Sequence, residues 1–295
     1  FMKKIGIYGK LIHADNVQFL EILVKSLREK TNAELYFHHN LFEHKNIFME
    51  NLGDKLFKGD DLIHNAVDIL ISFGGDGTFL DTATMVKDSQ IPILGINAGR
   101  LGFLANITQD DIAQAVDAIS NNKFKIDKRT LLEVNNSSDL FDSQCNFALN
   151  EITLVKKDSS SMLKINAEIN SNYLNTYWAD GLIIATPTGS TAYSLSCGGP
   201  ILTPGSDNFV ITPVAPHNLN LRPLVVSDDV EICLHAESRE GQFLLTMDSR
   251  PVSIDNGKKI ILKKANFSIK LIELTDQNFF KTIRNKLFWG KDSRN

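Results

Sequence analysis

The spacing of apolar residues predicts strands and helices that alternate in the first part of the chain. Four short runs predict strands, and two of them, residues 68–73 and 91–96, have the composition of strands buried on both faces. These runs occupy residues 5–8, 33–38, 68–73 and 91–96. Residues 15–30 and 79–86 carry apolar side chains at the spacing of one helical face. We therefore expect an α/β domain with a Rossmann-like parallel sheet over residues 1–128.

The pattern changes in the second part of the chain, where short strand-like segments replace this alternation. The segments lie at 147–155, 163–169, 182–186, 209–214, 230–235, 243–247 and 259–262. Many short strands separated by turn residues predict an all-β, sandwich-like domain over residues 129–268. In the tail, residues 269–295, apolar side chains recur at every fourth position, at Phe279, Ile283 and Leu287. That spacing predicts an amphipathic helix that packs back on the α/β domain.

A glycine-rich turn, residues 74–78 with the sequence Gly-Gly-Asp-Gly-Thr, lies between a predicted buried strand and a predicted helix. Ligands bind at such carboxyl ends of parallel strands, and glycine amides at a helix N-terminus favour anions. Thr78 is expected to cap the helix, with Asp81 completing a capping box. Asp76 would repel a phosphate, so its presence indicates chemical work such as accepting a proton or holding a metal through water. The alternative is an Asp-Gly turn that serves geometry alone.

A second glycine-rich turn, residues 97–104, follows the next predicted strand. Turns after neighbouring parallel strands face one crevice at the same edge of the sheet. Arg100 in this turn is expected either to meet a phosphate or to lie on the surface. Beyond it, Thr108 and Asp111 have the spacing of a capping box and predict the start of another helix.

The overall charge and the cysteine content argue against several classes of protein. The chain of 295 residues has a net charge of −4 and no run of basic residues, which argues against a nucleic-acid-binding protein. Its three cysteines lie far apart and fit no Cys-x-x-Cys pattern, so we expect a reduced protein without a zinc site. No apolar run approaches the ~20 residues that span a bilayer. A cytoplasmic protein that binds no membrane is therefore expected.

A hydroxyl-rich loop, residues 186–193 with the sequence Thr-Pro-Thr-Gly-Ser-Thr-Ala-Tyr, follows a predicted strand. We expect a rigid loop whose hydroxyls and amides meet polar ligand atoms, and Tyr193 adds a ring that can stack on a flat heterocycle. Asn150 and Glu151 interrupt an apolar strand pattern. Since neighbouring residues face opposite sides of a strand, at least one of them meets an interior or an interface. Either a ligand or the neighbouring strands would satisfy that polar group.

Together, these motifs resemble the NAD kinase family in their order and approximate spacing. The motifs are residues 74–78, residues 97–104, Asn150-Glu151, Asp180-Gly181 and residues 186–193. The octapeptide at 186–193 carries most of the specificity, because phosphofructokinases and diacylglycerol-type lipid kinases have turns similar to residues 74–78. The resemblance implies transfer of the γ-phosphoryl group of ATP to the 2′-hydroxyl of the adenosine ribose in NAD, giving NADP. It covers nearly the whole chain, including the change from α/β to all-β.

By this resemblance Asp76 is the base that takes the proton of the ribose hydroxyl. The nucleotide-binding residues that it implies are Gly75, Gly77, Phe103, Asn150, Glu151, Asp180, Thr188, Thr191, Ala192, Tyr193, Ser196 and Ala215. It also implies Mg²⁺ held through phosphates and water rather than by protein ligands, and a homodimer or homotetramer. The chain departs from the family at residues 248–250, Asp-Ser-Arg, where many members have Asp-Gly-Gln.

Two other functions stay open on the sequence alone. A lipid or sugar kinase of the same superfamily would share the glycine-rich turn. The hydroxyl-rich loop and Tyr193 suit a flat polar nucleotide better than an acyl chain. A non-catalytic dinucleotide sensor would bind NAD without consuming ATP, and only the intact Asp76 argues against it.

Overall fold

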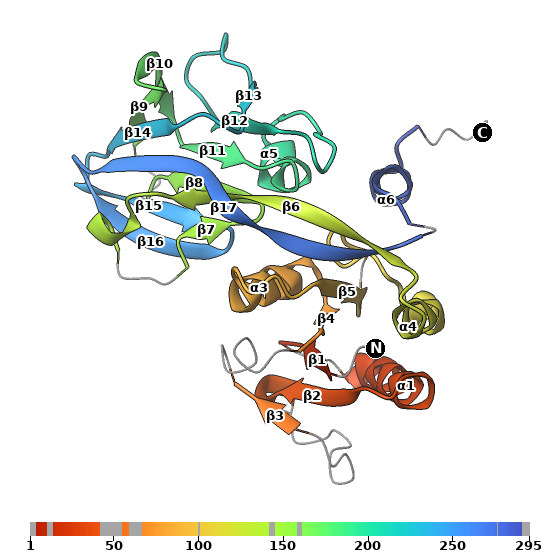
Figure 1. The fold of residues 1–295 in the computed structure, drawn as a ribbon. Helices are drawn as coiled ribbons and strands as arrows, with labels where there is room; N and C mark the ends of the chain where they lie inside the picture. Colours follow the sequence, from red (N-terminus) through yellow and green to blue (C-terminus); the bar gives the residue numbers. More distant parts are fainter. Residues whose placement is uncertain are drawn as a thin grey trace. The chain divides into compact units, whose positions relative to one another are not determined.

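The chain forms two compact units (Figure 1). The computed structural model describes residues 4–10, 14–41, 55–58, 67–99, 101–141, 145–157, 161–275 and 277–290. One unit joins Phe1–Lys128 with Ile269–Asn295, and the other is Arg129–Ser268. Two strands, β6 (Phe124–Val134) and β17 (Lys259–Leu274), run from one unit into the other.

The first unit is built on a parallel sheet. Its strands are β5 (Ile93–Asn97), β4 (Ile69–Gly74), β1 (Lys4–Tyr8), β2 (Glu34–His38) and β3 (Lys55–Phe57), in this spatial order. The last part of β17 joins β5 in parallel, where Leu271 lies opposite Ile93. β1, β4 and β5 are almost entirely buried, because apolar residues occupy both faces of the sheet. The expected parallel α/β sheet is confirmed, and the carboxyl ends of its strands lie at one edge.

Helices pack on both faces of this sheet (Figure 1). The helices and 3₁₀ turns of the unit are α1 (Ala14–Lys30), η1 (His39–Leu41), α3 (Asp76–Val86), η3 (Gln109–Asp111), α4 (Ile112–Ser120) and α6 (Phe279–Leu287). α1 and α4 share one core with Leu94 of β5. α3 lies on the opposite face, because Phe79 packs against Gly95, the next residue along β5. No helix within the described ranges is long and apolar enough to cross a lipid bilayer.

The start of α3 differs from the expected one. The helix begins at Asp76, so Thr78 lies inside the first turn and does not cap it. Asp81 forms an ion pair with Lys10 at 3.0 Å and does not close a capping box. A Cβ on Gly74 would overlap with the hydroxyl oxygen of Thr78. The glycine before the helix therefore lets Thr78 pack against the end of β4, which no spacing rule anticipates.

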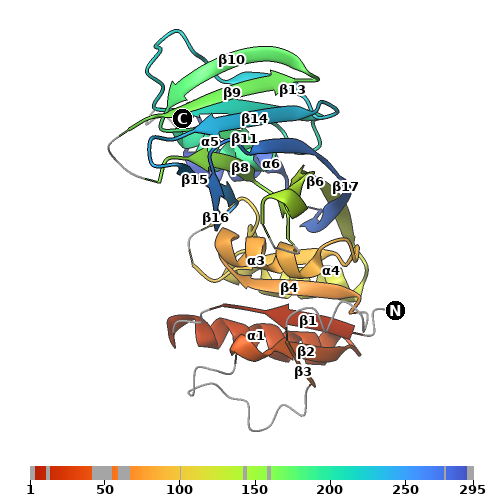
Figure 2. The same ribbon diagram turned by 90° about the vertical axis from the view of Figure 1, so that its left-hand side faces the viewer.

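The second unit consists of two antiparallel sheets. One has the order β13 (Leu224–Ser227), β12 (Asn208–Val214), β11 (Gly181–Ala185), β8 (Glu151–Val155), β15 (Gln242–Met247) and β16 (Arg250–Asp255). In the other, β10 (Asn172–Ala179), β9 (Leu163–Ile169), β14 (Ile232–Glu237) and β17 lie side by side (Figure 2), and β6 pairs with β17 and β7 (Phe147–Ala148). Apolar residues of both sheets form one core, for example Ile165 of β9 and Ile184 of β11. The expected all-β domain is confirmed.

The predicted strand at 147–155 is divided in the structure. β7 ends at Ala148 and β8 begins at Glu151, so Leu149 and Asn150 form a bend between them. Three short elements complete the unit, namely η4 (Ser137–Asp139), η5 (Gly189–Thr191) and α5 (Tyr193–Ser196). The bend directs the side chain of Asn150 away from the regular alternation of a strand.

Candidate active site

Asp76 stands at the carboxyl end of β4, and the second glycine-rich turn holds its carboxylate. Oδ1 accepts hydrogen bonds from the amides of Leu104 at 2.9 Å and Ala105 at 3.0 Å. Oδ2 accepts a hydrogen bond from the amide of Phe103 at 2.9 Å. A Cβ on Gly102 would overlap with Oδ1, so glycine is needed for this close approach. The two glycine-rich turns therefore meet at Asp76.

A fourth donor to the Asp76 carboxylate comes from the last helix of the structure. Nζ of Lys286 on α6 lies 3.4 Å from Oδ2 of Asp76 and 4.5 Å from the centre of the Phe103 ring. A carboxylate has about four lone-pair sites, and backbone amides occupy three of them here. Only the site on Oδ2 that faces Lys286 is not tied to the backbone. A proton can reach the carboxylate at that site.

Three contacts attach α6 and the residues before it to the Asp76 site, to the second glycine-rich turn and to the residues just after that turn. The side chain of Gln277 donates a hydrogen bond to the carbonyl oxygen of Asn106 at 3.3 Å. The rings of Phe279 and Phe103 have their centres 6.3 Å apart. Lys286 completes the set. The apolar spacing predicts this helix and its return to the α/β unit, but it gives no reason to select a lysine on the polar side of the helix.

The space around the other two glycines of the first turn is open. Both Gly75 and Gly77 are exposed, and a Cβ added to either would meet no atom within 4 Å. Packing therefore does not require glycine at these positions, whereas the approach of a ligand to the backbone at the start of α3 would. Arg100, the candidate phosphate contact of the second turn, lies outside the described residues.

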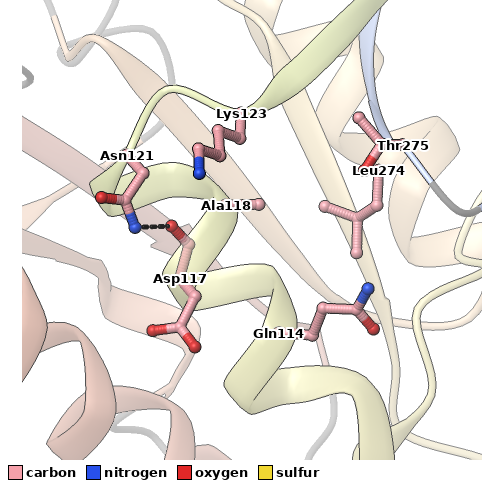
Figure 3. A pocket seen from close by; sticks show the side chains of 7 residues that line it. All are labelled: Gln114, Asp117, Ala118, Asn121, Lys123, Leu274 and Thr275. Atoms are coloured by element: carbon pink, nitrogen blue, oxygen red, sulfur yellow. Dashed lines mark hydrogen bonds between the residues drawn. The ribbon is translucent and has the colours of Figure 1, made fainter.

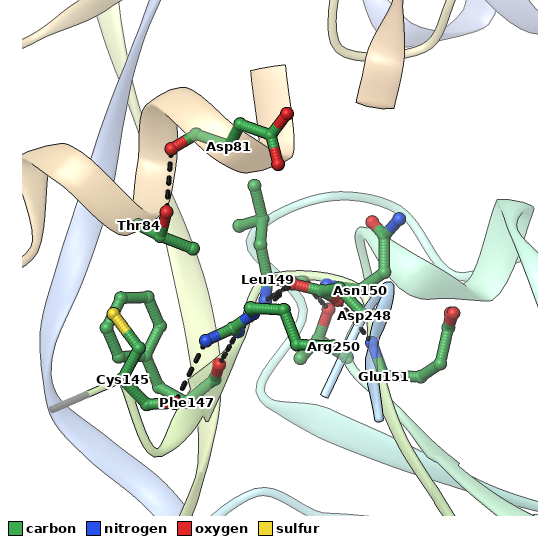
Figure 4. A network of polar contacts seen from close by, with 10 residues as sticks. Asp81, Thr84, Cys145, Phe147, Leu149, Asn150, Glu151, Asp248 and Arg250 are labelled. Atoms are coloured by element: carbon green, nitrogen blue, oxygen red, sulfur yellow. Dashed lines mark hydrogen bonds and ion pairs between the residues drawn. The ribbon is translucent and has the colours of Figure 1, made fainter. Parts of the chain in front are cut away.

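In the second unit, a buried aspartate holds the backbone around Asn150 (Figure 4). Asp248, between β15 and β16, accepts hydrogen bonds from the amides of Leu149 at 3.0 Å, Asn150 at 2.8 Å and Glu151 at 3.2 Å. Its side chain is 5 % exposed and its backbone φ is +52°. Burial raises the pKa of this carboxyl group, while the three amides and Arg250 lower it. Asp248 thereby fixes the directions in which Asn150 and Glu151 project.

Arg250, which stands where many family members have glutamine, binds the chain just before this bend (Figure 4). Its guanidinium donates hydrogen bonds to the carbonyl oxygens of Cys145, at 2.9 Å, and of Phe147. The guanidinium carbon also lies 5.7 Å from the centre of the Phe147 ring, and Nη2 lies 3.9 Å from Oδ2 of Asp248. Residues 248–250 therefore act in the structure as a clamp on residues 145–151.

The hydroxyl-rich loop holds the same bend from its other side. Oγ1 of Thr186 donates a hydrogen bond to the carbonyl oxygen of Leu149 at 2.6 Å. The backbone amide of Thr186 donates to the backbone carbonyl oxygen of Asn150 at 2.8 Å. Gly189 packs so closely that a Cβ would overlap with the carbonyl oxygen of Asn150. Ser190 is fully buried, and its hydroxyl donates to the carbonyl oxygen of Pro187 at 2.7 Å and accepts a hydrogen bond from the amide of Leu202 at 2.9 Å. The expectation that the loop turns its hydroxyls toward a ligand is therefore wrong for Thr186 and Ser190.

The remaining residues of this loop differ in their accessibility. Thr188 is 6 % exposed, and its hydroxyl accepts a hydrogen bond from Nη1 of Arg129 at 3.4 Å. Thr191 is half-buried and donates to the carbonyl oxygen of Thr188 at 3.1 Å. Ala192 is half-buried, and Ser196 is exposed at the end of α5. Thr191, Ala192 and Ser196 are thus at least partly exposed, whereas Thr188 is buried.

Glu151 is a buried carboxyl group with one oxygen left unpaired. Burial, and secondly the charge of Asp248, raise the pKa of Glu151 to about 8, although a hydrogen bond from the Tyr193 amide lowers it. Its Oε2 is buried and has no hydrogen-bond partner in the described part of the chain. At pH 7 the group is therefore mostly protonated and can both donate and accept. A ligand group is a natural partner for that oxygen.

Tyr193, Asp180 and Ala215 lie in the same part of the second unit as Glu151. The side chain of Tyr193 is 41 % exposed, and burial together with nearby groups that include Asp180 and Glu151 raises the pKa of its hydroxyl. Asp180 forms an ion pair with Lys156, with Oδ1 2.7 Å from Nζ. The amide of Asp180 bonds to the carbonyl oxygen of the residue before Ala215 at 2.9 Å. A ring face, two carboxyl groups and an open backbone turn are thus near one another.

The structure places the predicted residues in two groups, one in each unit. The first group is Gly75, Asp76, Gly77 and Phe103. The second group is Asn150, Glu151, Asp180, Thr188, Thr191, Ala192, Tyr193, Ser196 and Ala215. To these, the geometry adds Lys286 in the first unit, which has no local sequence signal, and Asp248 in the second, which belongs to the turn at residues 248–250.

A hollow of about 290 Å³ in the first unit includes none of these residues (Figure 3). It is lined by Gln114, Asp117, Ala118, Asn121, Lys123, Leu274 and Thr275. The side-chain amide of Asn121 donates a hydrogen bond to the carbonyl oxygen of Asp117 at 2.8 Å, which closes the end of α4. The hollow therefore belongs to the helix end and not to the predicted site.

Comparisons with known proteins all point to one family. Residues 5–124 match the ATP-NAD kinase N-terminal domain, and residues 149–274 match the ATP-NAD kinase C-terminal domain. The chain is 47 % identical to the NAD kinase of Flavobacterium psychrophilum, over 99 % of this chain and 100 % of that protein. It is 44 % identical to the NAD kinase of Flavobacterium johnsoniae, again over 99 % of this chain and 100 % of that protein.

Solved structures of similar fold belong to the same group of enzymes. Yeast NADH kinase complexed with NADH has a TM-score of 0.85 and 25 % identity, covering 99 % of this chain and 89 % of that chain. An NAD kinase from Archaeoglobus fulgidus in complex with ATP has a TM-score of 0.72 and 23 % identity, covering 97 % of this chain and 98 % of that chain. The likeness therefore extends over both units.

Proposed function

The chain belongs to the NAD kinase family, and from this premise we propose that it phosphorylates the 2′-hydroxyl of the adenosine ribose of NAD with ATP. The products are NADP, ADP and a proton. The observation that carries the proposal is the carboxylate of Asp76 at the start of α3, which has a single lone-pair site not tied to the backbone. This site lies at the edge of the sheet where α/β proteins bind their ligands.

In this reaction the ribose hydroxyl directs its hydrogen to the site on Oδ2 of Asp76 that backbone amides do not occupy. The hydroxyl oxygen forms a bond to the γ-phosphorus while the bond from that phosphorus to the β,γ-bridging oxygen breaks. The electron pair of the broken bond leaves with ADP, and Asp76 takes the proton and later releases it to water. A base of this kind contributes roughly 10²- to 10⁴-fold. Positioning and charge neutralisation at the open amides of residues 75–77 supply the remainder.

The second group of residues is assigned to the recognition of NAD. Protonated Glu151 can donate a hydrogen bond to a hydroxyl or carboxamide oxygen of the dinucleotide, and its unpaired Oε2 can accept one. The exposed ring of Tyr193 fits the stacking of a heterocycle. Thr191 and Ser196 are accessible for the adenine and nicotinamide ends. Asp248 and the hydroxyl-rich loop keep this arrangement rigid.

A divalent cation, Mg²⁺ by the resemblance, is assigned to the phosphates of ATP. In the described part of the chain, no group of three or more His, Cys, Asp or Glu side chains could hold a metal ion. We therefore propose that phosphate oxygens and water, rather than a cluster of protein side chains, hold the cation. On the nucleotide, such an ion supplies neutralisation of phosphate charge.

Replacing Asp76 by asparagine tests the role of the base. The asparagine oxygen can keep the hydrogen bonds of Leu104 and Ala105, but the amide cannot take a proton. We expect kcat to fall by at least about 10²-fold, with the binding of NAD unchanged. Asp81→Asn is the matched control, because it makes the same change on the same helix at a surface ion pair. Turnover by Asp76→Asn close to that of the control would rule out the role as base.

Incubation with labelled ATP and a choice of acceptors separates the candidate functions. Formation of NADP from NAD, measured with a coupled dehydrogenase, supports the proposal. NADH is included as an acceptor because the yeast relative is an NADH kinase. Phosphorylated diacylglycerol or sugar would instead identify a lipid or sugar kinase. Binding of NAD without consumption of ATP would identify a sensor.

A homodimer or homotetramer is also proposed, as the family resemblance implies. Apolar side chains exposed on edge strands of the second unit support it, with Trp178 and Tyr173 on β10 and Leu224 and Val225 on β13. Exposed apolar groups on sheet edges are typical of surfaces that pair with another chain. Light scattering of the purified protein measures the oligomeric state.

A further inference from the structure

The position of Lys286 defines where the phosphoryl group must pass. The acceptor hydroxyl has to reach the one site on Asp76 that backbone amides leave free, and Nζ of Lys286 faces that site at 3.4 Å. On the premise of the proposed function, we propose that Lys286 binds the γ-phosphoryl group during its transfer. In the structure its ammonium group contacts Asp76, and in the proposed reaction the phosphate draws it away as the hydroxyl takes its place.

The charge at this site explains why a cation is needed there. The glycine-rich turn provides amides for a phosphate, but Asp76 sets a negative charge in its middle. A phosphoryl group that approaches the hydroxyl beside Asp76 meets this charge unless a cation stands next to it. Lys286 has the correct sign and a flexible stem, so Nζ can turn from the carboxylate to a phosphate oxygen. Movement of the lysine also frees Oδ2 to accept the proton.

Several contacts besides the ion pair with Asp76 hold Lys286 in position. The Phe103 ring lies under Nζ at 4.5 Å, and a cation over a ring face is held in position by attraction. Gln277 and Phe279 fix the start of α6 to the turn that also binds Asp76. The helix therefore presents Lys286 to Asp76 from a fixed base, across 210 positions of sequence.

A purely structural ion pair is the alternative explanation. Both side chains of the Lys286–Asp76 pair are 31 % exposed. Ion pairs with this exposure contribute little to stability, because water screens them and two side chains lose freedom. Removal of the ammonium should then leave the protein folded, so a large loss of turnover would not be explained by unfolding.

The test compares three variants of the full-length protein in the coupled NADP assay, with thermal unfolding as a check of folding. Lys286→Met should lower kcat by about 10²- to 10³-fold, as the removal of one transition-state donor does. It should also raise the KM for ATP while leaving the KM for NAD within about twofold. Lys286→Arg keeps the cation and should restore a substantial part of the loss. Arg284→Met removes an exposed cation from the same helix and should behave as the wild type.

The outcomes distinguish a phosphate-binding Lys286 from a structural ion pair, and they separate failure of this inference from failure of the proposed function. If the wild type forms NADP and Lys286→Met keeps kcat within about threefold, the inference is overturned while the proposed function stands. Equal increases in the KM for ATP and the KM for NAD that persist in Lys286→Arg would also overturn the inference. They would indicate that Lys286 and Asp76 form a structural ion pair. If the wild type forms no NADP, the proposed function fails. In that case weaker binding of ATP to Lys286→Met, measured by calorimetry, would still support a phosphate site at Lys286, and unchanged binding would remove it.

Discussion

Replacing Glu151 by glutamine removes a titratable group that the fold keeps protonated. The pKa of Glu151 is raised from 4.5 to about 8, first by burial and second by the charge of Asp248. Between these pH values the unfolded chain releases a proton that the folded chain retains, so the free energy of unfolding falls as the pH rises. The loss is about 1.4 kcal/mol per pH unit between pH 4.5 and about 8. Above pH 8 the second unit is therefore less stable by about 3–5 kcal/mol than it is at low pH.

Glutamine carries no charge at any pH and has nearly the same shape, so it should escape this loss. We expect Glu151→Gln to be more stable than the wild type by about 2–4 kcal/mol at pH 8.5, and equal to it within error at pH 4. Urea titrations at both pH values measure this. A Trp289→Phe background leaves Trp178 as the fluorescent reporter of the second unit. Glu237→Gln, which alters an exposed pair with Lys164, is the control and should shift neither titration.

The result that would refute this reasoning is a urea midpoint of Glu151→Gln at pH 8.5 equal to that of the wild type. The same substitution should also change the pH dependence of the KM for NAD. If the protonated carboxyl group of Glu151 donates to NAD, the KM of the wild type for NAD rises as the pH passes about 8. In Glu151→Gln the KM should have no such inflection. Glu151 would then strengthen the binding of NAD while lowering the stability of the free protein at high pH.

Two further predictions concern the bend that carries Asn150 and Glu151. Asp248→Asn tolerates the positive φ at this position, but it sets an NH₂ group against the buried amide of Leu149. We therefore expect a loss of about 2–4 kcal/mol of stability in urea titrations. Because the charge of Asp248 helps to raise the pKa of Glu151, the KM for NAD should inflect at a lower pH in this variant. Wild-type values of both would contradict it. Thr186→Val leaves the carbonyl oxygen of Leu149 without its 2.6 Å donor and should cost about 1–3 kcal/mol in the same assay, with a rise in the KM for NAD. An unchanged midpoint would show that water replaces the hydroxyl.

Local patterns in the sequence are sufficient for the architecture and for the position of the chemical motifs. Continuous apolar runs predict the parallel strands of the first unit, and alternating patterns predict the short strands of the second, because burial imposes those periods on neighbouring residues. The capping box of Thr108 and Asp111 forms as predicted, with the Thr108 hydroxyl 2.7 Å from the Asp111 carboxylate. The same rule fails at Thr78, where close packing on Gly74 lets the helix begin at Asp76.

What only the tertiary structure decides is how each polar side chain is used. The sequence marks Asp76 as a carboxylate in an anion-binding turn, but three backbone amides determine which of its lone pairs the backbone leaves free, and a lysine 210 positions away lies at that site. It marks residues 186–193 as a ligand loop, whereas the fold uses Thr186 to hold a bend. Asp248 reaches that bend from 97 to 99 positions away. Such contacts join segments that are distant along the chain, and no local period reports them, because they arise only when separate elements pack together.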